Sequence, residues 1–115
     1  MTWMSLPYVF IGGGLGASLR WGLALLFKEL NFSLWGSTLL VNCLGTVFYF
    51  LSLKSPNSDF TQHLLRFGLF GALTTFSTLS YEVASAVKSG QYGTALAIFF
   101  LNIFAGVLIA IGMFR

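Results

Sequence analysis

The sequence has very few charged residues. Only 8% of its 115 residues are Asp, Glu, Lys or Arg, whereas 57% are hydrophobic. A water-soluble domain carries about 25% charged residues, so this composition excludes a protein surrounded by water and indicates an integral membrane protein in contact with the lipid bilayer. The length predicts a single domain over 1–115. The net charge of +3 comes without any basic run, so nucleic acid is not an expected partner.

Cysteine and histidine occur only once each. Cys43 lies in an apolar run, where it cannot form a disulfide within the chain and is too few for a zinc site, so we interpret it as a small hydrophobic residue. His63 ends the polar segment 54–63, which contains Pro56 and Asn57 and predicts a loop. We therefore expect a solvent-exposed histidine ring. Because no nucleophile accompanies it, the sequence predicts no enzyme and no catalytic residues.

Long apolar runs fill most of the chain. A bilayer-spanning helix needs about 20 mostly apolar residues, and four runs fit, over 7–27, 34–53, 64–87 and 92–114. Short connections make consecutive helices antiparallel neighbours, so the sequence predicts an all-α membrane protein with four transmembrane helices. In the first run, the pairs Gly12/Gly16 and Gly13/Ala17 have the spacing that lets another helix approach closely.

The middle of the third run is unusually polar for a membrane helix. Segment 68–80 reads Gly-Leu-Phe-Gly-Ala-Leu-Thr-Thr-Phe-Ser-Thr-Leu-Ser. Ser and Thr offer the backbone alternative hydrogen bonds and can loosen a helix. Backbone freed at membrane depth persists only inside protein or beside a polar cavity. We therefore expect a broken third helix at the centre of an ion pathway; the alternative is a regular helix whose hydroxyls bond back to its own carbonyls.

Polar side chains also occur deep in the second and fourth runs. Thr38, Asn42 and Thr46 are spaced i, i+4 and i+8, so they share one helix face. Asn102 lies in the middle of the fourth run, among phenylalanines. An asparagine at this depth either joins helices or lines a polar path, and the stripe on the second helix favours the path.

Arg20 and Glu82 are ionisable residues inside apolar runs. Arg20 follows the glycine pairs of the first helix, and Glu82 lies in the third helix after the hydroxyl cluster. Ionisable residues inside membrane segments are functional candidates by default. Two alternatives stay open: Arg20 snorkels to the interface, or Glu82 reaches water at the end of its run.

The positive charges are shared almost evenly between the two ends of the predicted helices. With alternating loops, the N-terminal side receives Lys54, Arg66 and Arg115, and the other side receives Lys28 and Lys88, with Arg20 if it counts with the nearer end. The positive-inside rule then barely prefers one orientation. Two oppositely oriented copies would form an antiparallel dimer, and inverted pairs place their ion sites near the bilayer midplane.

Three motifs carry a resemblance to a known family. They are Gly13-Gly14 and Gly16-Ala17 before Arg20-Trp21, then Gly36-Ser37-Thr38 before Asn42 and Gly45, and finally Gly68, Gly71 and Thr74-Thr75-Phe76-Ser77-Thr78. This pattern resembles the Fluc (CrcB) family of fluoride ion channels. The resemblance covers all four helices, and the Asn42 block together with the Thr-Thr-Phe-Ser-Thr block is highly specific. The second motif contains one residue, Ser37, that the family pattern does not have before the threonine.

The resemblance implies an antiparallel, dual-topology dimer in the cell inner (plasma) membrane, with two fluoride pores that export fluoride passively and protect the cytoplasm. It also implies one structural Na⁺ at the dimer interface, bound by backbone carbonyls of Gly71 and Thr74 from both subunits. Phe76 would turn its ring edge toward fluoride, and Asn42 would be the pore asparagine. The candidate pore residues are Arg20, Thr38, Asn42, Phe76, Ser77, Thr78, Leu79, Ser80, Glu82 and Asn102.

Two of these positions depart from the family pattern. Leu79 occupies the position of a second phenylalanine, and Asn102 replaces a small hydroxyl residue on the fourth helix. A fluoride site built from two rings would be incomplete at Leu79. Either the chain tolerates an aliphatic residue there, or it pairs with a paralogous subunit in place of a second copy of itself.

A different kind of transporter is the main alternative. Small dual-topology multidrug or cation exporters also have four helices, but they need a carboxylate in the middle of the first helix. The run 7–27 contains Arg20 as its only charged residue. A non-transporting assembly subunit is a third interpretation, but it leaves the polar residues around Asn42 and the hydroxyl cluster without a role.

Overall fold

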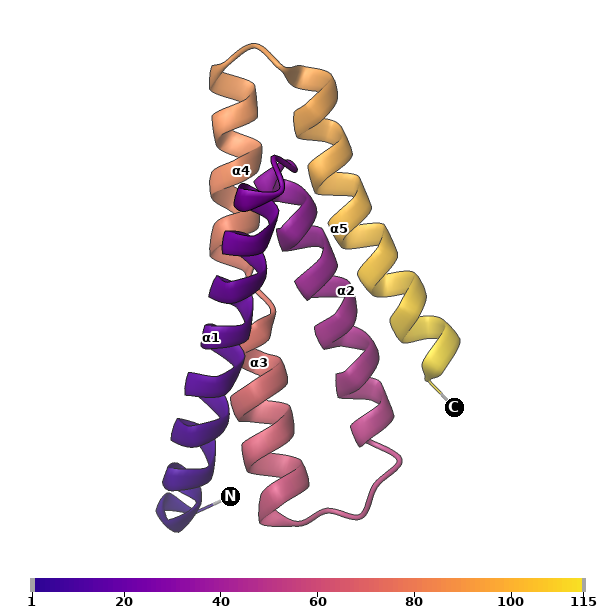
Figure 1. Cartoon of the computed structure of the whole chain (residues 1–115). Helices are drawn as coiled ribbons and strands as arrows, with labels where there is room; N and C mark the ends of the chain where they lie inside the picture. Colours follow the sequence, from indigo (N-terminus) through magenta and orange to yellow (C-terminus); the bar gives the residue numbers. More distant parts are fainter. Residues whose placement is uncertain (1, 115) are drawn as a thin grey trace.

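The computed structural model describes residues 2–114 and is helical throughout its regular structure (Figure 1). In chain order the elements are η1 (Trp3–Ser5), α1 (Leu6–Glu29), α2 (Leu34–Ser52), η2 (Asp59–Phe70), α3 (Gly71–Leu73), α4 (Phe76–Lys88) and α5 (Tyr92–Met113). No strand occurs within the described range. The predicted all-α class is therefore confirmed. Arg115, which entered the charge balance, lies outside the described residues.

Three segments are long and apolar enough to cross a membrane: Trp3–Glu29, Leu34–Ser52 and Tyr92–Met113. Their large hydrophobic side chains are mostly exposed on the isolated chain, as Phe10, Leu108 and Ile111 illustrate. A soluble protein buries such side chains, whereas lipid covers them at no cost. The chain is a multi-helix membrane protein.

Consecutive segments run up and down beside one another (Figure 1). The start of α1 and the start of η2 lie at one end of the molecule, and the connection from α4 to α5 lies at the other. That connection is tight because Gly90 adopts a φ of 74°, which glycine tolerates without strain. The short turns therefore place the polar segments of different helices at matching heights.

Glycines set the contact between α1 and η2, which is the most extensive in the fold. A side-chain carbon added at Gly12 would overlap the carbonyl oxygen of Leu64, and one added at Gly16 would overlap that of Leu69. Gly68 meets Gly12 from the opposite side. The predicted role of the Gly12/Gly16 pair is confirmed. Gly13, in the second pair, has no such neighbour within 4 Å.

The helix after the 54–58 connection begins before its predicted start at residue 64. Ser58 caps η2: its side chain accepts from the Thr61 amide, and the Thr61 side chain accepts from the Ser58 amide. This reciprocal pair starts a helix at Asp59, and η2 continues with π-helical winding. The prediction of a solvent-exposed His63 in a loop is wrong, because His63 lies inside η2 and is only 5% exposed.

Candidate functional site

Two residues with extended backbone, Thr74 and Thr75, separate α3 from α4. The Thr75 amide donates to Asn42 Oδ1 on α2 at 2.7 Å, and the Thr78 amide donates to Thr75 Oγ1 at 3.2 Å. In a continuous helix these two amides would instead donate to the carbonyls of Gly71 and Thr74, four residues earlier. Side chains have taken both donors, so both carbonyls are released from the helical ladder.

Asn42 is the centre of a chain of amide hydrogen bonds. Its Nδ2 donates to Asn102 Oδ1 at 2.8 Å and to the Thr75 carbonyl at 3.3 Å. Asn102, which is buried on α5, donates in turn to the Ile98 carbonyl at 2.8 Å. The two asparagines thus connect α5 through α2 to the extended residues, and each fixes the orientation of the next amide.

Hydroxyl groups continue this polar cluster on both sides of Asn42. Thr46 donates to the Asn42 carbonyl at 2.7 Å. Thr75 Oγ1 donates to Thr78 Oγ1 at 3.1 Å and lies 3.3 Å from Ser77 Oγ. These groups are uncharged and can reorient their protons, so they can offer either a donor or a lone pair to a passing ion.

Three hollows adjoin the cluster and share its residues. A hollow of ≈ 250 Å³ is lined by Asn42, Thr46, Thr74, Thr75, Phe76, Leu79, Asn102 and Ile103. Thr75 also lines a second hollow of ≈ 380 Å³ with Thr38, Thr78 and Arg20. Thr46 and Thr74 also line a third hollow of ≈ 330 Å³ with Arg66. Because they share residues, the three hollows adjoin one another from Arg66 past Asn42 to Arg20, and we call this row the polar track.

The two arginines at the ends of this track are held by neutral oxygens. Arg20 Nε donates to the Ala72 carbonyl at 3.1 Å. Arg66 is buried and donates to Ser52 Oγ at 3.1 Å, to the Ser52 carbonyl at 2.6 Å and to Asn57 Oδ1 at 2.8 Å. Across residues 2–114 no carboxylate lies within ion-pair distance of either one. Each end therefore carries a positive charge that is not cancelled by a carboxylate contact.

The predicted aromatic and hydroxyl residues of α4 divide into two groups. Phe76 lines the same hollow as Asn42, and 76% of its surface is exposed. Leu79 is buried beside it. Ser77 and Thr78 join the cluster through Thr75, but Ser80 is exposed and donates back to the Phe76 carbonyl at 2.9 Å. Within this chain, Ser80 is the predicted hydroxyl that the cluster does not include.

Glu82 and Thr38 lie beside each other on α4 and α2. Both carboxylate oxygens of Glu82 are buried, and the Thr38 hydroxyl beside them can donate a hydrogen bond to one of them. Thr38, on the Asn42 stripe, places this carboxylate next to the end of the track that contains Arg20.

The released carbonyls of Gly71 and Thr74 fit a hard monovalent cation. Unwound backbone carbonyls coordinate Na⁺ in other membrane proteins. One chain supplies two such oxygens, with the Thr74 hydroxyl at 3.4 Å from the Gly71 carbonyl. Among residues 2–114 no group of three or more His, Cys, Asp or Glu side chains is placed to hold a metal, so the donors offered here are backbone oxygens.

Thr75 and Arg66 line the track but were not among the predicted site residues. Thr75 supplies a backbone amide, a carbonyl and a hydroxyl to the cluster. Arg66 was counted only as a charge near a loop. The signal for Thr75 was present in the hydroxyl cluster itself. Arg66 could not be assigned from sequence, because its partners Ser52 and Asn57 come from the preceding helix end and connection.

The fold and the track define a helical membrane protein with a row of adjoining hollows that carry amide and hydroxyl groups between two arginines. The model of the family described as "CrcB-like protein, Camphor Resistance (CrcB)" matches residues 7–113. The chain therefore belongs to the CrcB family.

Curated relatives agree with this assignment over nearly the whole chain. A protein of Serratia proteamaculans named "Fluoride-specific ion channel FluC" is 41% identical, over 91% of this chain and 86% of its own length. Proteins of the same name from Thermus thermophilus and Escherichia coli are 39% and 38% identical; the alignments cover 89% and 96% of this chain and 86% and 92% of theirs.

Proposed function

We propose that this chain is a subunit of a fluoride-specific ion channel. The observation that carries the proposal is the polar track from Arg66 through Asn42 to Arg20, along which amide and hydroxyl groups occur among apolar side chains. The relatives are named as fluoride channels and not as enzymes, which supports the same function. The proposed pore residues are the predicted ones, Arg20, Thr38, Asn42, Phe76, Ser77, Thr78, Leu79, Ser80, Glu82 and Asn102, with Thr75 added; Ser80 lies outside the cluster of a single chain.

Fluoride is small and tightly hydrated, so it enters a dry pore only where other donors replace its water. The Asn42 amide and the hydroxyls of Thr75 and Thr78 supply such donors, and the electropositive edge of the exposed Phe76 ring can add to them. A lysine or arginine at the narrowest point would hold the anion too firmly, because conduction needs exit as well as entry. Here the arginines occur only at the ends of the track.

The extended residues Thr74 and Thr75 form the break in the third membrane helix under this proposal. A second copy in the inverted orientation, or a paralogous subunit, would bring its own Gly71 and Thr74 carbonyls to the same place. Four backbone oxygens would then bind one Na⁺ at the dimer interface. The cation would attract fluoride without lining the pore. Two copies in the cell inner membrane would give passive efflux of fluoride from the cytoplasm.

The decisive experiment measures fluoride efflux from liposomes that contain the purified single chain. We expect fluoride to leave quickly and chloride to be retained. Absence of fluoride efflux, or equally fast chloride efflux, would reject a fluoride-selective channel made of this chain alone. If adding a paralogous chain restores flux, the working channel is a heterodimer. Phe76→Ile, which removes the ring edge and keeps an apolar side chain, should reduce the flux sharply.

A small multidrug or cation exporter is less consistent with the chain. Such exporters need a carboxylate in the middle of the first helix, whereas the one carboxylate on α1, Glu29, is its last residue. Proton-coupled cation uptake by the same liposomes discriminates the two functions. A cation flux driven by a proton gradient, without fluoride efflux, would favour the exporter.

A further inference from the structure

The side-chain amides of Asn42 and Asn102 can adopt only one orientation, because backbone groups fix both ends of their hydrogen-bond chain. The Thr75 backbone amide can only donate, so the atom that it contacts at 2.7 Å is Asn42 Oδ1. The Ile98 carbonyl can only accept, so the atom that contacts it at 2.8 Å is Asn102 Nδ2. The bond between the two side chains then runs from Asn42 Nδ2 to Asn102 Oδ1, at 2.8 Å.

The two asparagines differ in how many of their donors have an acceptor. Each side-chain amide carries two N–H donors. Those of Asn42 have two acceptors within the chain, Asn102 Oδ1 and, at 3.3 Å, the Thr75 carbonyl. Those of Asn102 have one, the Ile98 carbonyl. One N–H of Asn102 is therefore left without an acceptor among residues 2–114, although only 6% of the residue is exposed, and a buried donor without an acceptor is unfavourable.

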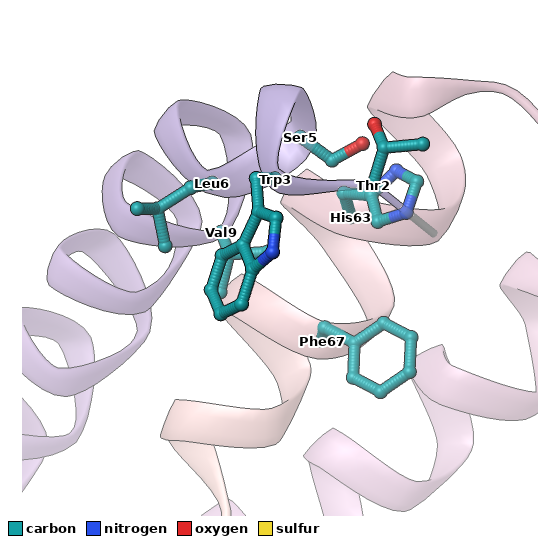
Figure 2. Close-up of a pocket in the computed structure, with 7 residues that line it drawn as sticks. All are labelled: Thr2, Trp3, Ser5, Leu6, Val9, His63 and Phe67. Atoms are coloured by element: carbon teal, nitrogen blue, oxygen red, sulfur yellow. The ribbon is translucent and has the colours of Figure 1, made fainter.

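The hollow of ≈ 250 Å³ that Asn102 lines has room for the missing acceptor. Leu79 and Ile103, which also line it, carry no polar side-chain atom. The larger cleft between the beginning of α1 and η2, of ≈ 390 Å³, shares no lining residue with this hollow and contains no asparagine (Figure 2). The unmatched amide donor thus belongs to a hollow on the proposed anion path.

We propose that the second N–H of Asn102 points into this hollow as the principal amide donor to fluoride, and that Asn42 is a positioning residue that holds the Asn102 amide in place. This role rests on the proposed fluoride channel and names the donor at its centre. Fluoride at this N–H displaces no existing bond, whereas fluoride at Asn42 Nδ2 must break a bond to Asn102 or to Thr75. A hydrogen bond from a buried donor to an anion is also among the stronger ones.

Replacement of Asn102 by leucine has opposite effects on the two candidate donors. Asn102→Leu removes the unmatched N–H, and it also removes the oxygen that occupies an N–H of Asn42. We expect the half-saturating fluoride concentration of efflux from liposomes to rise at least about tenfold. If Asn42 were the principal donor, its freed N–H would bind fluoride at least as well, so an unchanged or lower half-saturating concentration would overturn the proposal. Val9→Ala, in the cleft of Figure 2, is the control and should match the wild type.

A binding measurement on the unmodified protein depends neither on transport nor on the folding of a variant. The chain contains four asparagines, Asn31, Asn42, Asn57 and Asn102, so labelling asparagine with ¹⁵N gives four resolvable side-chain amide groups. Sodium fluoride added to the purified protein in detergent should shift one proton of the Asn102 amide, and sodium chloride at the same concentration should not. Asn31, in the exposed turn between α1 and α2, is the internal reference.

The two measurements together distinguish failure of this role from failure of the channel. Fluoride efflux without a fluoride-dependent shift at Asn102, or with a shift confined to Asn42, would refute the role of Asn102 and leave the channel in place. Absence of both the efflux and the shift would reject the fluoride channel and this role with it. A shift at Asn102 together with a raised half-saturating concentration in Asn102→Leu would support the assignment.

Discussion

Asn42 decides, at the scale of a single residue, whether the third segment can be a regular helix. Its Oδ1 takes the Thr75 amide at 2.7 Å, and its Nδ2 reaches the Thr75 carbonyl at 3.3 Å. One side chain therefore contacts both backbone groups of Thr75 and supplies the acceptor that the Thr75 amide lacks in the helical ladder. Because Nδ2 donates to Asn102 Oδ1 at 2.8 Å and to the Thr75 carbonyl at 3.3 Å, fluoride at the proposed site would have to compete with both oxygens for the Asn42 donors. This competition would weaken the binding of the anion and so favour its exit.

Replacement of Asn42 by aspartate tests its role as a hydrogen-bond donor separately from its role as the acceptor for the Thr75 amide. Asn42→Asp keeps an oxygen for the Thr75 amide, but it loses the donor and places a carboxylate on the anion path. We expect a folded protein whose fluoride efflux from liposomes, followed with a fluoride electrode, falls by at least about tenfold, since one lost charge-assisted hydrogen bond is worth about 1.5–3 kcal/mol.

Asn42→Leu is the matched comparison. It leaves the Thr75 amide without its acceptor, so we expect a lower melting temperature as well as lost flux, with about 1–3 kcal/mol less stability. An aspartate variant that conducts fluoride at the wild-type rate would remove Asn42 from the pore.

Sequence spacing predicted which residues share a face when they lie close together in the chain, but it did not predict contacts between distant residues. The stripe of Thr38, Asn42 and Thr46 follows from helical spacing alone. The bond between Asn42 and Thr75 joins residues 33 positions apart, and no local pattern indicates that pairing. His63 was misassigned for a related reason: the turn residues before it predicted a loop, but the Ser58 cap begins the helix early and Asp59 and Ser5 enclose the ring.

Two glycines of α1 provide a test at the scale of packed elements. An added carbon at Gly12 would overlap the backbone of η2, whereas one at Gly13 meets nothing within 4 Å. Gly12→Ala should destabilise the protein by about 1–3 kcal/mol through overpacking. Gly13→Ala should be neutral or stabilising by up to about 1 kcal/mol, because alanine favours a helix. Thermal unfolding in detergent compares them, and equal losses would mean that Gly13 also packs closely in the working assembly.

Arg66 connects two elements and carries a charge, and substitutions can distinguish these contributions. It holds the end of α2 and the following connection through Ser52 and Asn57. Arg66→Gln should lower stability by about 1–3 kcal/mol and slow fluoride entry most at low salt, where charge attraction acts over the longest range.

Arg66→Lys keeps the charge but lacks the planar fork, so we expect the stability loss with less loss of low-salt flux. Lys54→Gln, at an exposed position of the same end, is the control. If Arg66→Gln and Arg66→Lys have the same flux at every salt concentration, the Arg66 charge has no part in entry.

The elements that the sequence predicted best are those with uniform hydrophobicity. The runs over 7–27, 34–53 and 92–114 correspond to α1, α2 and α5 within a few residues, because lipid imposes their length. The third run is less regular because its amides have side-chain partners in Asn42 and Thr75, and the structure divides it into η2, α3 and α4. Its π-helical winding has no signal in the composition.

At the scale of the whole molecule, the isolated chain leaves its polar track open. The hollow with Phe76 and Asn42 lies at the surface of one copy, where Phe76 is mostly exposed. An anion path beside lipid would be unfavourable, so under the proposed function another protein surface would have to cover it. The balanced positive charges at the two ends permit insertion of the chain in either orientation. An inverted partner would cover the track and align the released carbonyls.

Charge substitutions can fix the orientation and test this requirement. Lys28→Ser with Lys88→Ser removes the lysines from one side of the membrane, and Lys54→Ser with Ser89→Lys shifts the balance the other way; all four positions are exposed. By the positive-inside rule each double variant should insert in one orientation.

We expect neither double variant to protect fluoride-sensitive cells alone, whereas co-expression of the two should restore growth in fluoride and rapid fluoride efflux. Restoration would also show that both variants fold. A single variant that is shown by terminal labelling to have one orientation, and that conducts fluoride alone, would contradict the inverted dimer.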